Sequence, residues 1–240
     1  MKCFVVGVSG GIDSALTSTL CALTQKPVIV LNMPIHQHKK QYDLAAMHID
    51  WLKKKFITVS SHEIKLTGTF LKLKNTLPKD IQDNHSMANT RSRLRMLTLY
   101  TFSTHYRMLV AGTGNKVEDF GVGFFTKYGD GGVDLSPIAD LMKSEVYALA
   151  GELGIIKPIL KAPPVDGLWA DNRTDEQQIG ASYDELEKAM KYLNSKFEIR
   201  NSNLTTREKE AIKIYQRFHA MNEHKMKPIP VCVIPAKLKK

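Results

Sequence analysis

A short loop near the N-terminus combines residue types that can hold a phosphate chain. Residues 7–15 read GVSGGIDSA and follow an apolar run. Gly10 and Gly11 allow a tight turn that exposes backbone N–H groups, and a helix starting here adds the positive end of its dipole. Asp13 would repel a phosphate unless a cation such as Mg²⁺ stood between them. The alternative is a plain link between a strand and a helix, with Asp13 as an ordinary helix-start residue.

A second loop of similar character, GTGNKVE at residues 112–118, follows the apolar run MLVA. Its Glu118 can share a cation with Asp13, because the two carboxylates would then come from two adjacent strand ends. Taken alone, Glu118 is also compatible with a surface glutamate at a helix start. The Walker A pattern GxxxxGK[ST] is absent from the sequence, and the first loop lacks the GxGxxG spacing of a dinucleotide-binding fold.

The elements that must position these loops alternate between strands and helices. Nearly continuous apolar runs predict strands buried on both faces, at residues 3–8, 27–33, 56–60 and 108–112. Helical patterns lie between them, at residues 13–24, 41–54 and 92–106. This alternation predicts a doubly wound, mostly parallel α/β sheet, for which we expect five strands with helices on both faces. Ligands of such sheets bind beyond the carboxyl ends of the strands, where both loops lie.

The second half of the sequence is more helical. Ser182 with Glu185, and Thr205 with Glu208, have the three-residue spacing of helix capping boxes. Gly154 is placed to end a helix. We expect a single domain over residues 1–240, with a nucleotide-binding α/β core (1–156), a mobile loop (157–178) and a helical C-terminal part (179–240).

Composition and charge exclude several classes of protein. With 240 residues, 43% of them hydrophobic and 24% charged, the chain is typical of a globular domain. No apolar run approaches the roughly 20 residues that span a bilayer, and the start has no signal-peptide pattern, so we expect a cytoplasmic protein without a membrane partner. Cys3, Cys21 and Cys232 are scattered, which argues against a zinc ribbon, an iron–sulfur cluster or a disulfide framework. The formal charge of +10 indicates an anionic partner, either a small polyanion such as a nucleotide or a nucleic acid.

The pattern SGGxDS at residues 9–14 resembles the signature of the ATP pyrophosphatase (PP-loop) group. Enzymes of that group, with an adenine-nucleotide α-hydrolase-like fold, cleave ATP between its α and β phosphates and adenylate an oxygen of the second substrate. A longer match covers nearly the whole chain: residues 112–147 closely resemble ammonia-dependent NAD⁺ synthetase, as do NTRSRLRM (89–96), APPVDGLWADNRTDEQQIGASYDELE (162–187) and EHK (223–225).

This resemblance implies a reaction. The family makes NAD⁺ from deamido-NAD⁺ (nicotinic acid adenine dinucleotide), ATP and ammonia, and releases AMP and pyrophosphate after an acyl-adenylate intermediate. Glutamine-dependent members carry a separate amidase domain, for which this chain has no room, so free ammonia is the expected donor. Water would destroy the adenylate, so we expect the stretches 78–90 and 157–178 to close over the site. A homodimer is expected, with deamido-NAD⁺ at its interface.

The resemblance also assigns residues to substrates and metal. It assigns ATP to Gly7, Val8, Ser9, Gly10, Gly11, Ile12, Asp13, Ser14, Thr113, Lys143 and Val165. It assigns deamido-NAD⁺ to Arg93, Lys127, Asp134, His224 and Lys225, with Arg95 as a second arginine near the first. It assigns Mg²⁺ to Asp13 and Glu118. The family usually carries threonine where this chain has Val165, so a hydroxyl contact to ATP is not expected there.

Two residues are expected to take part in the chemistry. Lys143 would neutralise the charge that develops on the leaving pyrophosphate, and its alternative is a solvated helix lysine. Asp130 would hold ammonium and take its proton, since NH₃ must attack. The alternative role for Asp130 is to form the turn TKYGDGG. The stretch between Glu118 and Lys127 is one residue longer than in many relatives, which makes the assignments across it less direct.

Two other functions are compatible with parts of the sequence. A PP-loop ligase that modifies tRNA would explain the charge of +10, although the absence of CxxC weighs against the sulfur-transferring types. A catalytically silent nucleotide-binding module is opposed by Asp13, Glu118 and Lys143, because a pure binder needs no pair of metal carboxylates. We therefore expect small-molecule substrates and no nucleic acid partner.

Overall fold

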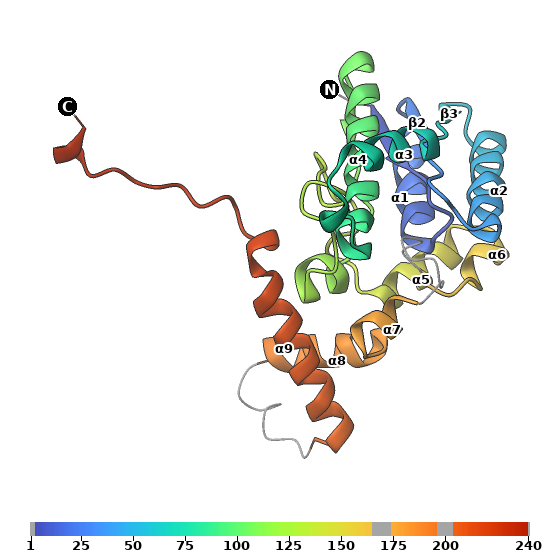
Figure 1. The fold of residues 1–240 in the computed structure, drawn as a ribbon. Coiled ribbons are helices and arrows are strands. Elements are labelled where there is room, and N and C mark those ends of the chain that lie inside the picture. The colour runs from blue at the N-terminus through green and yellow to red at the C-terminus, as the bar shows by residue number, and fades with distance from the viewer. Residues whose placement is uncertain (1–2, 165–173, 196–203, 240) are drawn as a thin grey trace.

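Four parallel strands form the sheet at the centre of the fold. The computed structural model describes residues 3–164, 174–195 and 204–239 (Figure 1). Among these residues the strand order is β3-β2-β1-β4, and every pairing is parallel. The expected fifth strand is not confirmed, because the position next to β4 holds a single bridge between Ala111 and Leu135. The strands are β1 (Phe4–Gly7), β2 (Val28–Asn32), β3 (Val59–Glu63) and β4 (Leu109–Val110).

Alternate residues of the central strands pack into two apolar layers. Val6 packs in a cluster with Leu52 of α2 (Lys39–Lys55). Val5 packs in a second cluster, which contains Phe70 of α3 (Thr67–Thr76). Because β1 and β2 are covered on both faces, their sequences are continuous apolar runs. The prediction of helices on both faces is confirmed (Figure 1).

Helices connect the strands and build most of the second half of the chain. The helix expected over 92–106 begins earlier, at Asn84, because the Asp83 side chain accepts a hydrogen bond from Ser86 N and caps it. The further helices are α1 (Ile12–Leu23), η1 (Lys79–Ile81), α4 (Asn84–Tyr106), the π-helix η2 (Lys116–Val122), α5 (Lys143–Glu152), α6 (Lys157–Leu160), α7 (Asp175–Ile179), α8 (Tyr183–Asn194), α9 (Thr206–Met226) and η4 (Ala236–Leu238).

The two stretches expected to form lids have more regular structure than the sequence indicates. Residues 78–90 contain η1 and the first turns of α4, and their closure over the site stays a prediction. Residues 157–178 contain α6 and the first turn of α7. The middle of that stretch, residues 165–173 with Val165, lies outside the described residues.

Local signals at the helix ends are confirmed. The Ser182 and Thr205 side chains each accept a hydrogen bond from the backbone three residues later, and the glutamates there bond back, so both capping boxes form. Gly154 has φ +72° just after α5, a left-handed conformation that stops a helix at low cost for glycine.

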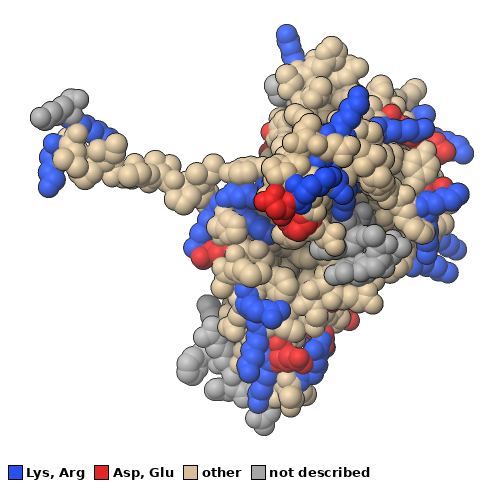
Figure 2. All heavy atoms as spheres, in the orientation of Figure 1, with Lys and Arg blue, Asp and Glu red and all other residues tan. Residues whose placement is uncertain are grey.

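The C-terminal helices pack against the loop that follows β4. Val117 and Val122 of η2 lie in one apolar cluster with Leu186 of α8 and Tyr215 of α9. After α9 the chain extends away from the body (Figure 1). In Figure 2, Lys and Arg side chains are spread over several parts of the visible face and do not form one stripe. Among the described residues, no helix is long and apolar enough to cross a membrane.

Candidate active site

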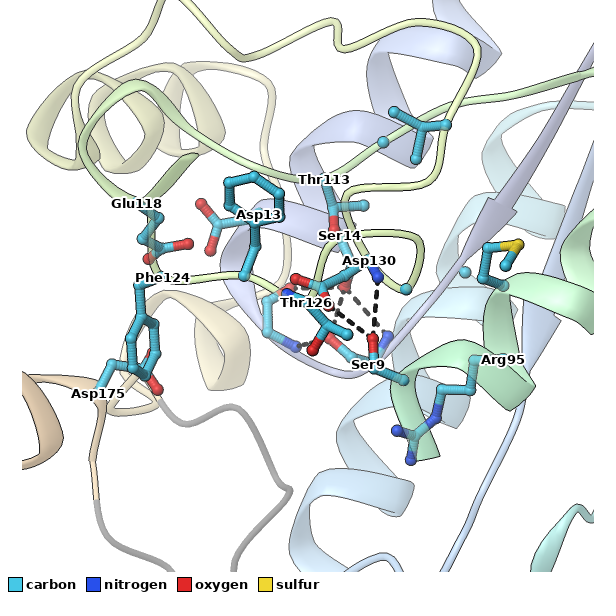
Figure 3. Close-up of a pocket in the computed structure, with 18 of the residues that line it drawn as sticks. Ser9, Asp13, Ser14, Arg95, Thr113, Glu118, Phe124, Thr126, Asp130 and Asp175 are labelled. Atoms are coloured by element: carbon cyan, nitrogen blue, oxygen red, sulfur yellow. Dashed lines mark hydrogen bonds between the residues drawn. The ribbon is translucent and has the colours of Figure 1, made fainter. Parts of the chain in front are cut away.

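A cavity of about 700 Å³ opens at the carboxyl ends of β1 and β4. This is the switch point of the sheet, because β1 has β2 on one side and β4 on the other. The volume lies in the range of roughly 300–1,000 Å³ that is typical of small-molecule sites. Its lining includes the loop after β1 together with Thr113 and Glu118 (Figure 3). Lys143 lines the cavity as well. The two glycine-containing loops of the sequence therefore meet at one site.

Serine hydroxyls hold the first loop in shape. Ser14 Oγ donates to Gly11 O at 3.0 Å and accepts from Ser9 N at 3.1 Å. Ser9 Oγ accepts from Gly11 N at 3.2 Å. Gly10 has φ +90°, and a Cβ there would lie 2.5 Å from the backbone oxygen of Gln41 in α2. The loop therefore requires glycine at position 10, where the backbone approaches α2 closely. Ser9 and Gly11, on either side of Gly10, line the cavity.

The two carboxylates expected to bind metal lie on either side of one buried lysine. Lys143 Nζ donates to Asp13 Oδ2 at 2.6 Å and to Glu118 Oε1 at 2.9 Å. The Lys143 side chain is only 3% exposed, and the two acidic side chains are 18% and 15% exposed. Figure 3 shows Asp13 and Glu118 side by side at one end of the cavity. The alternatives of a surface glutamate at Glu118 and a solvated lysine at Lys143 are therefore wrong.

Asn115 contacts Asp13 and also caps the helix that carries Glu118. Its Nδ2 donates to Asp13 Oδ1 at 3.1 Å, and its Oδ1 accepts from the backbone N–H groups of Val117 and Glu118. Asn115 thereby caps η2, the π-helix that carries Glu118. The backbone hydrogen bonds of a π-helix span one residue more than those of an α-helix, and such turns often occur at functional sites. This helix can accommodate the extra residue expected between Glu118 and Lys127.

Tyr183, the first residue of α8, closes the carboxylate cluster from the other side. Its hydroxyl donates a short hydrogen bond to Glu118 Oε1 and lies 3.2 Å from Asp175 Oδ2. Its ring lies 4.7 Å from Lys143 Nζ, which places the ammonium over the ring. Burial first, and the nearby carboxylates second, raise the pKa of Tyr183 far above its ordinary value, so the hydroxyl stays protonated.

The charges in this cluster do not balance. Burial favours a lower pKa for Lys143, but the charges of Asp13 and Glu118 outweigh it and raise that pKa, so the ammonium stays charged. Burial and the nearby Glu118 carboxylate raise the pKa of Asp13, although Lys143 opposes the shift. Two largely buried carboxylates thus share one ammonium. The site has an excess of negative charge that a second cation can neutralise.

Basic side chains from α4, α9 and the loop after η2 also line the cavity, and together they form its basic wall. Lys127 Nζ donates to His224 O at 2.5 Å, and an Arg93 guanidinium nitrogen lies 3.4 Å from Lys127 O. Lys225 Nζ donates to Gly123 O and to a neighbouring carbonyl, so it joins α9 to the loop after η2. Burial lowers the pKa of Lys225. Four of the five residues expected to contact the second substrate, Arg93, Lys127, His224 and Lys225, line this part of the cavity.

Asp134, the fifth of those residues, does not line the cavity. It is exposed, and its carboxylate accepts hydrogen bonds from Val110 N (2.8 Å) and from the Tyr100 hydroxyl (3.0 Å). Arg95 does line the cavity, where it donates to Met33 O at the end of β2. Thr113 also lines it, as expected.

Asp130 lies on the cavity wall and also holds the turn around it. Its Oδ1 accepts from Ser92 Oγ at 2.6 Å and from Thr126 N at 3.1 Å. Burial raises the pKa of Asp130, although these hydrogen bonds oppose the effect. The turn-forming role is therefore confirmed. The role in proton transfer stays a prediction, which the raised pKa favours.

Comparison with known proteins identifies the family. The sequence model of NAD synthase matches residues 1–229. This chain belongs to the NAD synthase family. The family resemblance seen in the sequence, and with it the expectation of an enzyme, is confirmed.

Individual relatives agree with the family assignment. The NH₃-dependent NAD⁺ synthetase of Methanosarcina acetivorans is 35% identical over 236 residues, which cover 95% of this chain and 88% of the relative. Among solved structures, NMN synthetase from Francisella tularensis has a TM-score of 0.79 at 30% identity, covering 97% of this chain and 89% of that one. NH₃-dependent NAD synthetase from Campylobacter jejuni, in complex with the nitrate ion, has a TM-score of 0.76 at 27% identity, covering 97% and 90%.

The side chains of the acidic cluster are suitable ligands for Mg²⁺. Asp13 and Glu118 offer carboxylate oxygens beside the SGGxDS loop, and their excess negative charge favours a cation. No group of three or more His, Cys, Asp or Glu side chains arranged to hold a metal occurs in the described part of the chain. Asp13 and Glu118 would hold Mg²⁺, which would supply charge neutralisation beside a nucleotide.

Sequence reasoning missed two residues of this cluster. Asn115 had a usable signal, because asparagine directly before a helix is a common N-cap. Tyr183 had none, because its neighbours in the sequence indicate only the start of α8. Its contact with Glu118 joins positions 65 residues apart and depends on how α8 packs against η2.

Proposed function

We propose that this chain forms NAD⁺ by amidating deamido-NAD⁺ with ammonia, while ATP is cleaved to AMP and pyrophosphate. The observation that carries the proposal is the buried Asp13–Lys143–Glu118 cluster beside the SGGxDS loop. It would supply two carboxylate ligands for a metal ion, and an ammonium to neutralise phosphate, in a cavity that basic side chains also line. The basic wall suits an acceptor that carries phosphates.

The proposed reaction has two steps. An oxygen of the nicotinate carboxylate attacks the α phosphorus of ATP, and the bond between that phosphorus and the bridging oxygen breaks. Pyrophosphate leaves with the electron pair, and Lys143 stabilises its charge. Ammonia then attacks the carbonyl carbon of the adenylate, the bond to AMP breaks, and one proton is lost.

Residues of this chain prepare both steps. The loop at 9–14 would bind the β and γ phosphates, because its backbone and the start of α1 favour anions. Mg²⁺ bound by Asp13 and Glu118 would supply charge neutralisation for the phosphates. Asp130 would take the proton from ammonium, because burial raises its pKa and makes it a better base. The homodimer expected from the resemblance stays a prediction.

A second candidate acceptor is nicotinate mononucleotide, whose amidation gives NMN. The observation in its favour is the structural similarity to NMN synthetase from Francisella tularensis, at a TM-score of 0.79. The same carboxylate cluster would serve this reaction, since the carboxyl group that reacts is the same. The two candidates differ in what the basic wall must hold, which is a dinucleotide in one case and a mononucleotide in the other.

A product assay separates the candidates. The purified protein is given ATP, Mg²⁺ and ammonium with either acceptor, and AMP, NAD⁺ and NMN are measured by HPLC. The proposal predicts equal amounts of NAD⁺ and AMP, and a higher kcat/KM for deamido-NAD⁺ than for the mononucleotide. A higher kcat/KM for the mononucleotide would establish the second candidate. Both proposals fail if neither acceptor yields AMP, or if Asp13→Asn is as active as the parent enzyme.

A further inference from the structure

The Tyr183 hydroxyl has no assigned role, yet it touches the acidic cluster at its centre. It donates to Glu118 Oε1 and lies 3.2 Å from Asp175 Oδ2, while Lys143 donates to the same Glu118 oxygen. Both donors therefore use Oε1. Neither of these two donors uses Oε2, the second oxygen of Glu118.

We propose that Tyr183 is a positioning residue that fixes the Glu118 carboxylate so that Oε2 faces Mg²⁺. The inference rests on the proposed function, because it takes Asp13 and Glu118 as the metal ligands. A donor bound to one oxygen sets the rotation of the whole carboxylate group. Such partners of metal ligands commonly change metal affinity by roughly 10–100-fold when they are removed.

The surroundings of Tyr183 make its hydroxyl a rigid donor. Tyr183 is 6% exposed and packs in the apolar cluster with Val117 and Leu186. Its backbone N–H donates to Glu176 Oε1 at 2.8 Å, and the capping box at Ser182 fixes the start of α8. The hydroxyl position is thus set by the fold before any ligand binds.

Lys143 cannot supply the same constraint. Its ammonium is carried by a flexible chain, bonds Asp13 as well as Glu118, and is the group expected to move onto a phosphate when ATP binds. When it moves, Glu118 Oε1 loses one of its two donors. Tyr183 is the donor that stays, because its ring is held by packing on α8. Glu118 is therefore still oriented when the metal and the nucleotide arrive together.

The test compares two tyrosine variants with the parent enzyme. Tyr183→Phe removes the hydroxyl and keeps the ring, including the face beside Lys143. Tyr215→Phe is the matched control, because Tyr215 lies in the same apolar cluster and is also 6% exposed. The probe is Mn²⁺, titrated into protein saturated with the non-cleavable analogue α,β-methylene-ATP and followed by electron paramagnetic resonance. No acceptor or turnover is needed.

The expected result is specific to Tyr183. Its Phe variant should bind Mn²⁺ roughly 10-fold or more weakly, whereas Tyr215→Phe should match the parent enzyme. The affinity for the ATP analogue without metal, measured by calorimetry, should be the same in all three proteins. If Tyr183→Phe does not fold, Tyr183→Met provides a second variant without the hydroxyl, since methionine adapts to irregular core space. The same loss of Mn²⁺ affinity is expected.

Two outcomes would overturn the inference while the metal site stands. One is parental Mn²⁺ affinity in Tyr183→Phe together with lost affinity in Glu118→Gln. The other is an equal loss in Tyr183→Phe and Tyr215→Phe, which would indicate general loosening of the cluster. Unchanged Mn²⁺ binding in Glu118→Gln would instead refute the metal assignment itself, and the inference with it.

Discussion

Replacing Lys143 with methionine tests the charge balance of the acidic cluster. The ammonium is 3% exposed and bonds both Asp13 and Glu118, so its removal leaves two buried carboxylates without their shared counter-charge. The variant can restore the original net charge by taking up one proton on a carboxylate. Protonating an aspartate whose ordinary pKa is 3.8 costs about 1.4 kcal/mol of free energy for each pH unit above that pKa.

The expected loss of stability follows from that proton. Near pH 7 the free energy of unfolding should fall by about 4 kcal/mol, and near pH 5 by about 2 kcal/mol. The first value agrees with the 3–5 kcal/mol typical of a broken buried ion pair. The raised pKa of Lys143 means that its ammonium stabilises the folded state, and this stabilisation is complete at any pH below its ordinary pKa of 10.5. That contribution disappears only as the pH rises through the folded value.

Urea unfolding followed by circular dichroism, with EDTA present, measures these differences. The melting temperature near pH 7 should fall by roughly 6–20 °C for a chain of this size. Adding Mg²⁺ should recover part of the loss, because a divalent cation can replace the ammonium between the carboxylates. Equal stability of the variant and the parent protein near pH 7 would refute the reasoning. A loss that does not shrink toward pH 5 would refute it as well.

Four further changes have expected outcomes. Gly10→Ala should lower the free energy of unfolding in urea by about 1–3 kcal/mol, because φ is +90° and the new Cβ meets the backbone of α2. The control Gly68→Ala should not destabilise the protein, because a Cβ there meets no atom. Asn115→Ala should lower the free energy of unfolding by about 0.5–2 kcal/mol, because η2 loses its N-cap. It should also raise the Mg²⁺ concentration needed for half-maximal activity, and an unchanged Mg²⁺ requirement would contradict the link between Asn115 and Asp13. Asp130→Asn keeps an acceptor for the turn, so it should lower kcat with little change in melting temperature, and an unchanged kcat would exclude proton transfer by Asp130. Burial lowers the pKa of His48 to about 4, so stability should fall by about 3 kcal/mol as the pH drops from about 6.5 to about 4, and His48→Gln should flatten that slope.

Much of the fold could be predicted because it rests on local signals. Continuous apolar runs located β1, β2 and β4, and the capping boxes located the starts of α8 and α9. The strand expected over 56–60 begins three residues later, at Val59, and its polar residues are not buried on both faces as predicted. The start of α4 was placed too late, because the polar first turns of this helix have no apolar periodicity and depend on the Asp83 cap. The fifth strand was expected from the pattern of such sheets, and no sequence signal shows that Leu135 forms only a bridge with Ala111.

The site residues that directly follow strands could be predicted from the sequence. Asp13 and Glu118 follow two strands that are neighbours in the sheet, so their meeting follows from the topology. Tyr183 reaches the same cluster through the packing of α8 against η2, which no local pattern encodes. Asp134 was expected to touch the second substrate, but its carboxylate holds the backbone of β4 at Val110, outside the cavity lining.

The proposed function depends on adenylation of the acceptor by ATP at this cluster. Deamido-NAD⁺ labelled with ¹⁸O in both carboxylate oxygens, incubated with ATP, Mg²⁺ and ammonium, follows that step directly. We expect mass spectrometry to find one ¹⁸O in AMP and none in pyrophosphate, because the attacking oxygen stays on the α phosphorus. AMP without ¹⁸O, or cleavage of ATP to ADP and phosphate, would contradict the proposed function.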